Sequence, residues 1–323
     1  MIKIGLIGCG FMGAMHANCY SNIEGVKVTA VADIRREKAE SIANGAEIYS
    51  DGKDLINNAD VDVIDICLPT YLHAEYAMLA MEKVKYLFIE KPVALFNEEA
   101  IKMIEKSKET GTQVQVGQVI RFWDEYVELK KIVDSNKYGK VVNANFRRIS
   151  PTPTWGYEDW LRNATRSGGA AQDLHVHDTD FVLSLFGTPI KFSSIKNTIG
   201  EKNSYINTLM QYEDFCVTVE GTWNLPSSHP FEATFRVVFE NATVENAGGK
   251  FLCYTENGVE EIKIDKKELI GGISGGNISD LGGYFNELLY FTDRVKAGAK
   301  IEKATLLDAS KSLLFVLEEI KNA

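Results

Sequence analysis

The sequence has few cysteines, few prolines and no long apolar run. Its 323 residues include 5 Cys and 7 Pro. The odd number of cysteines, with no C-x-x-C pair, argues against a disulfide framework or a zinc knuckle and predicts reduced, buried thiols. No apolar run approaches the roughly 18 residues that span a membrane, and no secretory leader pattern precedes the first apolar segment. We therefore expect a soluble, cytoplasmic protein that does not bind a membrane.

Basic clusters are missing as well. The chain has 35 Lys and Arg against 45 Asp and Glu, which gives a formal net charge of -10. Without a basic block to hold phosphate backbones or anionic lipids, we expect no nucleic-acid partner. The 45% apolar and 25% charged content is typical of globular proteins, and the length suggests two domains.

The first 33 residues contain an ordered motif. The apolar segment 2–7 suits a strand buried on both faces of a parallel sheet. A glycine pattern G-x-G-x-x-G follows it, then a helical segment, then the apolar run 26–32, which ends at an acid twenty residues past the third glycine. The residues of the pattern and the acid are Gly8, Gly10, Phe11, Met12, Gly13 and Asp33.

This spacing predicts a dinucleotide site. Gly8 allows a tight turn, Gly10 has no Cβ to block a pyrophosphate, and Gly13 lets the helix pack close to the sheet. The helix N-terminus then binds phosphates. Asp33 can accept hydrogen bonds from a ribose hydroxyl and would repel a 2′-phosphate, which favours NAD, while Arg35 and Arg36 keep NADP possible.

Strands and helices alternate up to residue 117, which predicts a doubly wound parallel sheet. Asn97 is expected to cap a helix that runs to Thr110. Ligands of such sheets bind beyond the carboxyl ends of the strands. The residues that fall at this edge are Leu68, Pro69, Thr70, Glu90, Lys91, Pro92 and Gln118.

The pattern changes after residue 120. A helix is expected at 123–136, a strand at 140–150, a long irregular segment at 151–169 and a helix at 173–186. Several β-like runs between 190 and 264 predict an open, mostly antiparallel sheet. The glycine-rich segment 271–283 is equally consistent with a flap and with a linker, and two helices are expected after it. We predict a Rossmann domain at 1–120 and a substrate-binding α/β domain at 121–323.

Two groups of residues could carry acid–base chemistry. Lys91 is placed to project its ammonium from the sheet edge. On a helix, Asp173 and His177 are four apart and share a face, and a histidine beside a carboxylate is a plausible general base or acid. A zinc or iron site at His175 and His177 is the rival interpretation. Because side chains at i and i+2 converge on a strand and not on a helix, we predict no metal.

These residues resemble a known family. The motifs are Gly8-x-Gly10-x-x-Gly13-x-x-His16 with Asp33, Pro69-Thr70-x-x-His73, Glu90-Lys91-Pro92, and Asp173-x-x-x-His177-Asp178 after Gly168-Gly169. In this order, over nearly the whole chain, they resemble the glucose–fructose oxidoreductase / inositol dehydrogenase / rhizopine catabolism (Gfo/Idh/MocA) oxidoreductases. His175 departs from the glycine or apolar residue that many relatives carry there.

The resemblance implies an NAD(P)-dependent dehydrogenase that acts on a secondary alcohol or ketone of a sugar or cyclitol. It implies Lys91, Asp173 and His177 as the catalytic set, and a homodimer or homotetramer built through the open sheet. His73, Trp160 and Arg162 are expected near the cofactor, and Arg121 and Tyr157 near the substrate. A nucleotide-sugar dehydrogenase, a non-catalytic NAD-binding sensor and a metal hydrolase at His175 and His177 are the alternatives.

Overall fold

The structure is a computed structural model that describes residues 1–197, 204–264 and 281–323. Its contacts form two compact units. The described residues of the first unit are 1–122 and 281–311, and those of the second are 123–197, 204–264 and 312–323. The domain boundary at residue 120 stays a prediction. Residues 271–280 of the expected flap or linker lie outside the described residues.

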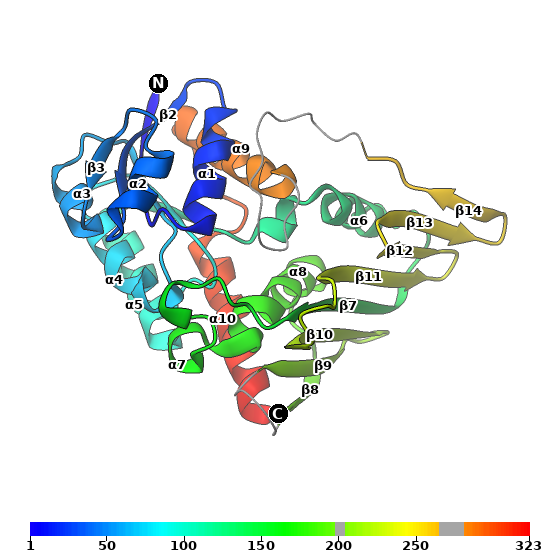
Figure 1. Cartoon of the computed structure of the whole chain (residues 1–323). Coiled ribbons are helices and arrows are strands. Elements are labelled where there is room, and N and C mark those ends of the chain that lie inside the picture. Colours follow the sequence, from blue (N-terminus) through cyan, green and yellow to red (C-terminus); the bar gives the residue numbers. More distant parts are fainter. Residues whose placement is uncertain (198–203, 265–280) are drawn as a thin grey trace. The chain divides into compact units, whose positions relative to one another are not determined.

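The first unit contains a six-stranded parallel sheet with the order β3-β2-β1-β4-β5-β6. Figure 1 labels β2 and β3 of this sheet. The chain reverses its direction of winding at β1, so the predicted doubly wound sheet is confirmed. The strands are β1 (Ile2–Ile7), β2 (Val26–Ala32), β3 (Glu47–Tyr49), β4 (Val63–Ile66), β5 (Tyr86–Ile89) and β6 (Gln113–Val116).

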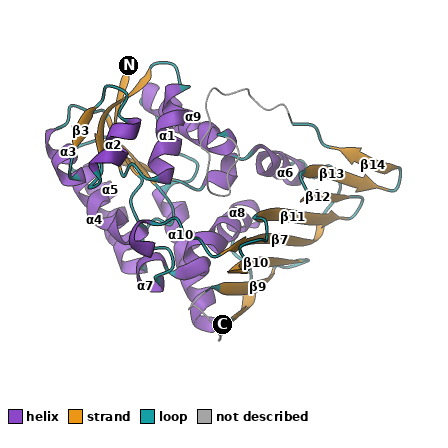
Figure 2. Ribbon diagram, viewed as in Figure 1, coloured by secondary structure: helices purple, strands orange, loops and turns teal. Residues whose placement is uncertain are grey.

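Helices cover both faces of this sheet (Figure 2). Helix α1 packs against α9, while α4 packs against both α3 and α5. β5 is a continuous apolar run because both of its faces are buried, and β4 is buried along its whole length although it contains Asp65. The helices are α1 (Phe11–Ser21), α2 (Arg36–Ile42), α3 (Gly52–Asn58), α4 (Thr70–Ala80), α5 (Asn97–Thr110) and α9 (Gly282–Lys296).

The expected cap of α5 is wrong by one residue. Asn97 is the first helical residue, and Phe96 occupies the cap position. The carboxylate of Glu99 accepts the Phe96 N–H at 3.2 Å, which satisfies a donor that the helix itself leaves open. The carboxylate of Glu99 in the first turn therefore caps the helix, a role that the sequence suggested for the Asn97 side chain.

The second unit contains an eight-stranded sheet with the order β14-β13-β12-β11-β7-β10-β9-β8. Among the strands that the structure describes, only the pair β7–β10 is parallel, so the predicted open, mostly antiparallel sheet is confirmed. The strands are β7 (Val141–Pro151), β8 (Lys191–Lys196), β9 (Tyr205–Gln211), β10 (Cys216–Leu225), β11 (Glu232–Phe239), β12 (Thr243–Ala247), β13 (Lys250–Thr255) and β14 (Gly258–Glu261).

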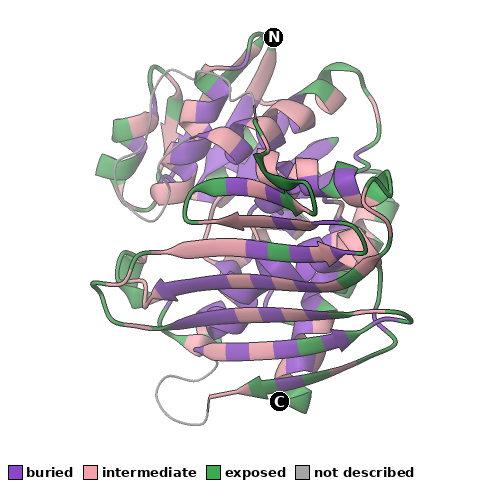
Figure 3. Ribbon diagram, turned by 90° about the vertical axis from the view of Figure 1, so that its right-hand side faces the viewer, coloured by how far each residue is buried: buried purple, intermediate pink, exposed green. Residues whose placement is uncertain are grey.

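Aromatic side chains form the core on one face of this sheet. Tyr126 from α6 (Asp124–Asp134) packs edge-on against Phe181 of α8 (Val176–Phe186) and Phe235 of β11, with ring centroids 4.9 and 5.0 Å apart. The C-terminal part of α10 (Leu306–Asn322) adds Phe315 against Phe192. Buried residues alternate with more exposed ones along the strands (Figure 3), as expected when one face packs on helices.

Two local features differ from the sequence prediction. The helix expected at 173–186 begins as a π-helical turn, Ala171–His175, before α8. The irregular segment 151–169 holds a short helix, α7 (Ala164–Ser167), and two consecutive residues with positive φ, Glu158 at 50° and Asp159 at 58°. Such backbone conformations are costly for non-glycine residues and often mark functional loops.

All five cysteines are free, but they are not uniformly buried as predicted, because Cys216 is exposed and Cys67 is half-buried. In the described ranges of the chain, we find no helix long and apolar enough to cross a membrane.

Candidate cofactor and catalytic site

The glycine loop between β1 and α1 has the shape of a phosphate cradle. Gly8 has φ of +92°, and a Cβ there would lie 2.5 Å from the Cys67 carbonyl oxygen. A Cβ at Gly13 would lie 1.9 Å from the Gly8 oxygen, so both glycines are required by the fold. A Cβ at Gly10 would meet only the Arg35 guanidinium, at 3.8 Å. The space that Gly10 leaves, beside the first turn of α1 at Phe11 and Met12, fits a pyrophosphate.

Asp33 lies at the end of β2 and is 8% exposed. Its carboxylate accepts the Cys9 N–H at 2.9 Å, beside the glycine loop, and the Arg35 N–H at 2.8 Å. The Arg35 guanidinium folds back onto the same carboxylate, with Nε at 3.2 Å. Arg36 is turned away and pairs with Glu40 at 2.7 Å. Of the two arginines noted in the sequence, only Arg35 lies at the expected ribose site.

Buried polar atoms without partners also lie at the carboxyl edge of the sheet. Among the described residues, the Thr70 hydroxyl and the Gln118 amide oxygen are buried and make no hydrogen bond. Such atoms are costly to bury unless something else satisfies them. Thr70 begins α4 directly after Pro69, and Gln118 follows β6. Both fit the contacts that a polar dinucleotide would supply.

His73 joins the loops that follow β4 and β5. Its Nδ1 lies 2.8 Å from the Pro92 oxygen, and its Nε2 lies 2.7 Å from the Leu68 oxygen. Burial lowers the pKa of His73 and outweighs the two carbonyls, which favour the charged ring. His73 is therefore a structural clamp between two expected cofactor loops, and Lys91–Pro92 in the second loop is a cis peptide bond.

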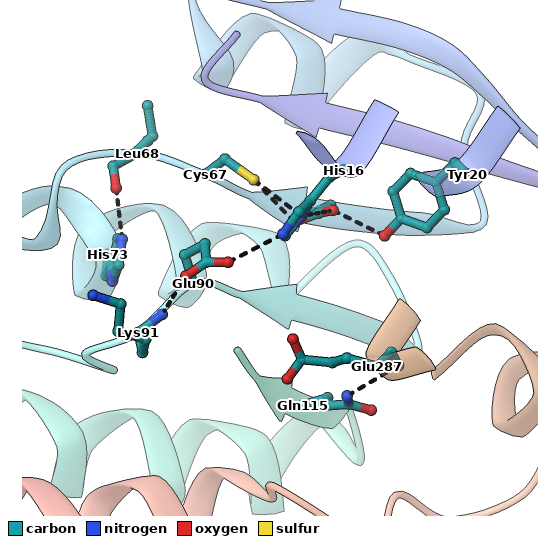
Figure 4. Close-up of polar contacts among 10 residues, drawn as sticks. His16, Tyr20, Cys67, Leu68, His73, Glu90, Lys91, Gln115 and Glu287 are labelled. Carbon is teal, nitrogen blue, oxygen red and sulfur yellow. Dashed lines mark hydrogen bonds and ion pairs between the residues drawn. The ribbon is translucent and has the colours of Figure 1, made fainter. Parts of the chain in front are cut away.

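Glu90 and Lys91 follow β5 at the same edge. Glu90 is 5% exposed, and one carboxylate oxygen accepts the backbone N–H of Lys91 at 3.0 Å. The other oxygen lies 3.0 Å from Nε2 of His16, a residue of α1 (Figure 4). Burial would raise the pKa of Glu90, but His16 and Lys91 outweigh it and lower that pKa. Lys91 itself is half-buried, as its place at the sheet edge predicts.

In the second unit, Asp173 and His177 lie on either side of the junction between the π turn and α8. Asp173 is half-buried and His177 is 8% exposed. A π turn holds more residues per turn than an α-helix, so a separation of four across this junction comes close to one full turn. The regular α-helix expected there is not found, and the sharing of a face by Asp173 and His177 stays a prediction. Lys91 belongs to the first unit.

His175 does not join this pair. It is 0% exposed, and its Nε2 lies 3.2 Å from the Glu319 carboxylate, which also accepts the Thr179 hydroxyl at 3.4 Å. A Cβ at Gly221 of β10 would lie 2.7 Å from the His175 Cβ, so this ring sits tightly between the sheet and α10. Across the described residues, His175 and His177 form no cluster of metal-ligand type.

Asp178, next to His177, anchors α8 in the core of the second unit. Arg148 is 2% exposed and donates from Nε to the Asp178 carboxylate at 2.8 Å and from Nη2 at 3.2 Å. The same Nη2 donates to the Tyr126 hydroxyl at 3.1 Å. This forked geometry fixes the start of α8. The sequence showed the His177-Asp178 pair but gave no sign of its basic partner on β7.

The remaining predicted residues have varied surroundings. Trp160 packs against the cluster that contains Leu161 and Trp223. Arg121 pairs with Asp308 at 3.4 Å, and Tyr157 is 38% exposed. Arg162, paired with Asp159 at 3.0 Å, lines a cavity of about 310 Å³ within the second unit. The cavity is lined by Pro151, Thr152, Thr154, Arg162, Leu225 and Ser227.

Comparison with known proteins agrees with the glycine loop and the carboxyl-edge residues. Residues 2–118 match the model described as "Oxidoreductase family, NAD-binding Rossmann fold", and residues 126–245 match "GFO/IDH/MocA C-terminal domain". The chain belongs to the Gfo/Idh/MocA oxidoreductase family. The first unit is therefore an NAD-binding Rossmann domain, and the resemblance stated from the motifs is confirmed.

Curated relatives share about 30% of their residues with the chain. Uncharacterized oxidoreductase YrbE of Bacillus subtilis (strain 168) is 31% identical over 58% of this chain and 55% of its own length. The scyllo-inositol 2-dehydrogenase (NAD(+)) of the same organism is 29% identical over 72% of this chain and 70% of its own. The chain thus spans little more than half the length of the first relative and about two thirds of the second.

A solved structure shares the fold. The apo scyllo-inositol dehydrogenase of Lactobacillus casei superposes with a TM-score of 0.80 at 20% identity, over 100% of this chain and 96% of that one. At this identity the likeness establishes the fold of the two proteins and leaves the substrate open.

Proposed function

We propose that this chain is an NAD-dependent dehydrogenase that transfers a hydride between nicotinamide and a secondary alcohol or ketone of a sugar or cyclitol. The observation that carries the proposal is the position of Lys91. It follows β5 at the carboxyl edge of the sheet, where ligands of doubly wound folds bind, and its backbone is held by the buried Glu90 carboxylate. Inositol dehydrogenases among the relatives support the substrate class.

We propose that the enzyme binds NAD in preference to NADP. A buried carboxylate at the end of β2, beside the glycine loop, can accept hydrogen bonds from ribose hydroxyls and repels a 2′-phosphate. Arg35 pairs with the same carboxylate, which partly neutralises its charge and weakens its attraction for a 2′-phosphate. Expected cofactor contacts are Gly8, Gly10, Phe11, Met12, Gly13, Asp33, Leu68, Pro69, Thr70, His73, Glu90, Lys91, Gln118, Trp160 and Arg162.

Within this proposal each catalytic residue has a separate role. The cofactor supplies the hydride acceptor. His177 takes the proton of the substrate hydroxyl, and Lys91 holds the reacting oxygen and stabilises its alkoxide character. Asp173 orients His177 or the substrate. Arg121 and Tyr157 are proposed substrate contacts.

The cavity beside Arg162 favours a second candidate substrate class. A guanidinium at the wall of a cavity of about 310 Å³ suits the diphosphate of a nucleotide sugar, because Arg binds phosphate oxygens through paired donors. In this second candidate Arg162 contacts the substrate in place of the cofactor. A nucleotide-sugar dehydrogenase is therefore the second candidate within the same chemistry.

The first test measures NADH absorbance against a panel of inositols, aldoses, anhydro sugars and UDP-sugars. Lys91→Ala should lower kcat about 100- to 1,000-fold, as the loss of an oxyanion donor does. His177→Ala should lower kcat about 100- to 10,000-fold, as the loss of a general base does. Both variants should still bind NADH, since neither side chain is needed to form the glycine loop, but Lys91→Ala should bind it more weakly because Lys91 is itself an expected cofactor contact.

One lysine and one histidine outside the proposed site serve as matched controls. Lys85 is an exposed lysine at the opposite end of β5, and His229 lies outside the motifs. Lys85→Ala and His229→Ala should keep wild-type kinetics. NADH binding without turnover of any panel member would contradict the proposed activity on these substrates and would favour the sensor alternative.

A further inference from the structure

His16 sits at the centre of a buried polar cluster that the proposed chemistry does not use. It lies on α1, is 0% exposed, and has a carboxylate at each ring nitrogen (Figure 4). Its Nδ1 lies 2.8 Å from the Asp65 carboxylate of β4, and its Nε2 lies 3.0 Å from the Glu90 carboxylate. These partners are 49 and 74 residues away in the sequence. Only a ring protonated at both nitrogens can donate to both carboxylates at once.

The charges around His16 come from three further elements. Asp65 and Cys67 face it from β4 and the residue after it, and Glu90 and Lys91 from the end of β5. Tyr20 on α1 donates its hydroxyl to Asp65 at 2.8 Å, and the Tyr284 ring of α9 lies 6.5 Å away. On the same side, Cys19 of α1 and Glu287 of α9 interact electrostatically with one another.

The balance of these charges favours imidazolium. Burial opposes the charge and is the largest single effect, yet Cys67 and Asp65 outweigh it and raise the pKa of His16 well above its usual value. Burial also raises the pKa of the Cys67 thiol well above its usual value. The geometry points the same way, because Nδ1 lies at hydrogen-bond distance, 2.8 Å, from the Asp65 carboxylate.

The cluster reaches Lys91 through Glu90. One Glu90 oxygen faces His16, and the other accepts the Lys91 N–H at 3.0 Å. On the far side, a Cβ at Gly117 would lie 3.1 Å from the Glu90 carboxyl atoms, so the glycine leaves just enough room for this carboxylate. The orientation of Glu90 is thus set from several directions at once, and the Lys91 backbone follows from it.

We propose that His16 is a positioning residue that acts through Glu90 to hold Lys91 at the sheet edge. The proposal rests on the proposed function of Lys91. It assigns a role to a residue that neither touches substrate nor belongs to the catalytic set.

A metal site is the competing interpretation, since single ligand atoms of His16, Asp65 and Cys67 lie within 4.8 Å of one another. Two observations favour the hydrogen-bonded cluster. The distance of 2.8 Å between Nδ1 and the Asp65 oxygen is that of a direct hydrogen bond. The other ring nitrogen, Nε2, lies 3.0 Å from the Glu90 carboxylate, which is again the distance of a direct hydrogen bond.

Two isosteric variants separate the partners of His16. The amide nitrogen of Asn can take the place of Nδ1, and that of Gln the place of Nε2, while both side chains are neutral. His16→Asn therefore keeps a donor toward Asp65 and loses the one toward Glu90, whereas His16→Gln does the reverse. Tyr20→Phe removes one hydrogen bond from the same cluster but leaves both carboxylates on His16, and it serves as the matched control.

The first readout does not depend on turnover. The rate of reductive methylation of Lys91, followed by peptide mass spectrometry, reports the environment of its amine. We expect His16→Asn to change this rate about threefold or more, because the amine loses the position that Glu90 sets. His16→Gln should change it less, and Tyr20→Phe should match wild type. Equal rates in wild type and His16→Asn would overturn the proposal, even if no panel substrate is found and the proposed function fails.

The second readout is kinetic, with active enzyme counted by NADH binding. His16→Asn should lower kcat about 10- to 100-fold, the effect of a misplaced reacting group. Both neutral variants leave Glu90 without its cation, so the acidic limb of their pH profiles should move to higher pH. A merely structural role would lower the amount of folded enzyme and leave the pH profile unchanged. Equal loss of kcat in the Asn and Gln variants would contradict a route through Glu90.

Two measurements keep the proposal testable if the His16 variants do not fold. Gly117→Ala presses on the Glu90 carboxylate from the other side and should change the Lys91 methylation rate in the same assay. In wild type, the ¹⁵N shifts of His16 should show imidazolium at pH 7. A neutral ring, or one equivalent of tightly bound transition metal that is lost in Cys67→Ser, would overturn it.

Discussion

At the residue scale, Asp33 and Arg35 form a pair that bears on cofactor choice. The guanidinium is held by the carboxylate and also lies nearest to the open space at Gly10. Asp33→Asn removes the repulsion of a 2′-phosphate and releases Arg35. We expect NADPH affinity to rise about tenfold, or roughly 1.4 kcal/mol, relative to NADH. Fluorescence titration of both reduced cofactors gives the ratio of their dissociation constants.

The role of Arg35 in that change can be isolated. In Asp33→Asn combined with Arg35→Ala, the gain in NADPH affinity should disappear. Arg36→Ala is the control, because Arg36 is exposed and pairs with Glu40. An Asp33→Asn protein with the wild-type ratio of affinities would show that this carboxylate does not discriminate between the cofactors.

At the element scale, the position of α8 depends on the buried pair Arg148–Asp178. Arg148→Met leaves the Asp178 carboxylate buried without its cation, which typically costs about 3–5 kcal/mol. Urea unfolding should show this loss. The double variant Arg148→Met, Asp178→Leu should recover much of it, because no buried charge remains unpaired.

The exposed pair Lys130–Asp134 on α6 is the matched control for that experiment. Lys130→Ala should leave the unfolding midpoint close to wild type, since exposed ion pairs contribute little. If Arg148→Met were as stable as Lys130→Ala, the buried fork would not be what holds α8 in place.

Local patterns predicted most elements, and long-range pairing explains what they missed. Apolar runs and the glycine loop located β1, β2 and β5 because their signals lie within a few residues. The π turn before α8 and the parallel β7–β10 pair have no local signature. Asp65 offered one overlooked sign, a charged residue inside the apolar strand β4. Its partner His16 could be recognised only once the fold brought α1 and β4 together.

The residues of the candidate site fall into the same two groups, those suggested by local motifs and those found only from the fold. The motifs predicted Lys91, Asp173 and His177 as the catalytic set, which stays a prediction, whereas the partners of the neighbouring Glu90 and Asp178 came from the fold. His175 shows the limit of spacing arguments. The pattern His-x-His suggested a ligand pair, but His175 lies in the core, where its Nε2 contacts the carboxylate of Glu319, 144 residues away.

At the scale of the whole molecule, the open sheet of the second unit bears on assembly. Leu209 pairs with Ser193 on β8, so Ile195 lies on the same face, opposite to Phe192 and the helices. Leu209 is 47% exposed and Ile195 is 62% exposed. Exposed apolar residues on a sheet face suit burial against another chain, and we propose that this face joins copies into a dimer or tetramer.

The oligomeric state tests that proposal directly. Light scattering coupled to size exclusion should give two or four times the mass of one chain for wild type, and Leu209→Lys should shift the population toward smaller species, because a buried charge at the interface has no partner. Leu314→Lys is the control, since Leu314 is 44% exposed but lies on α10 and not on the sheet. A wild-type protein with the mass of one chain would rule the interface out. Equal dissociation by both variants would place the interface on α10 or attribute the effect to charge in general.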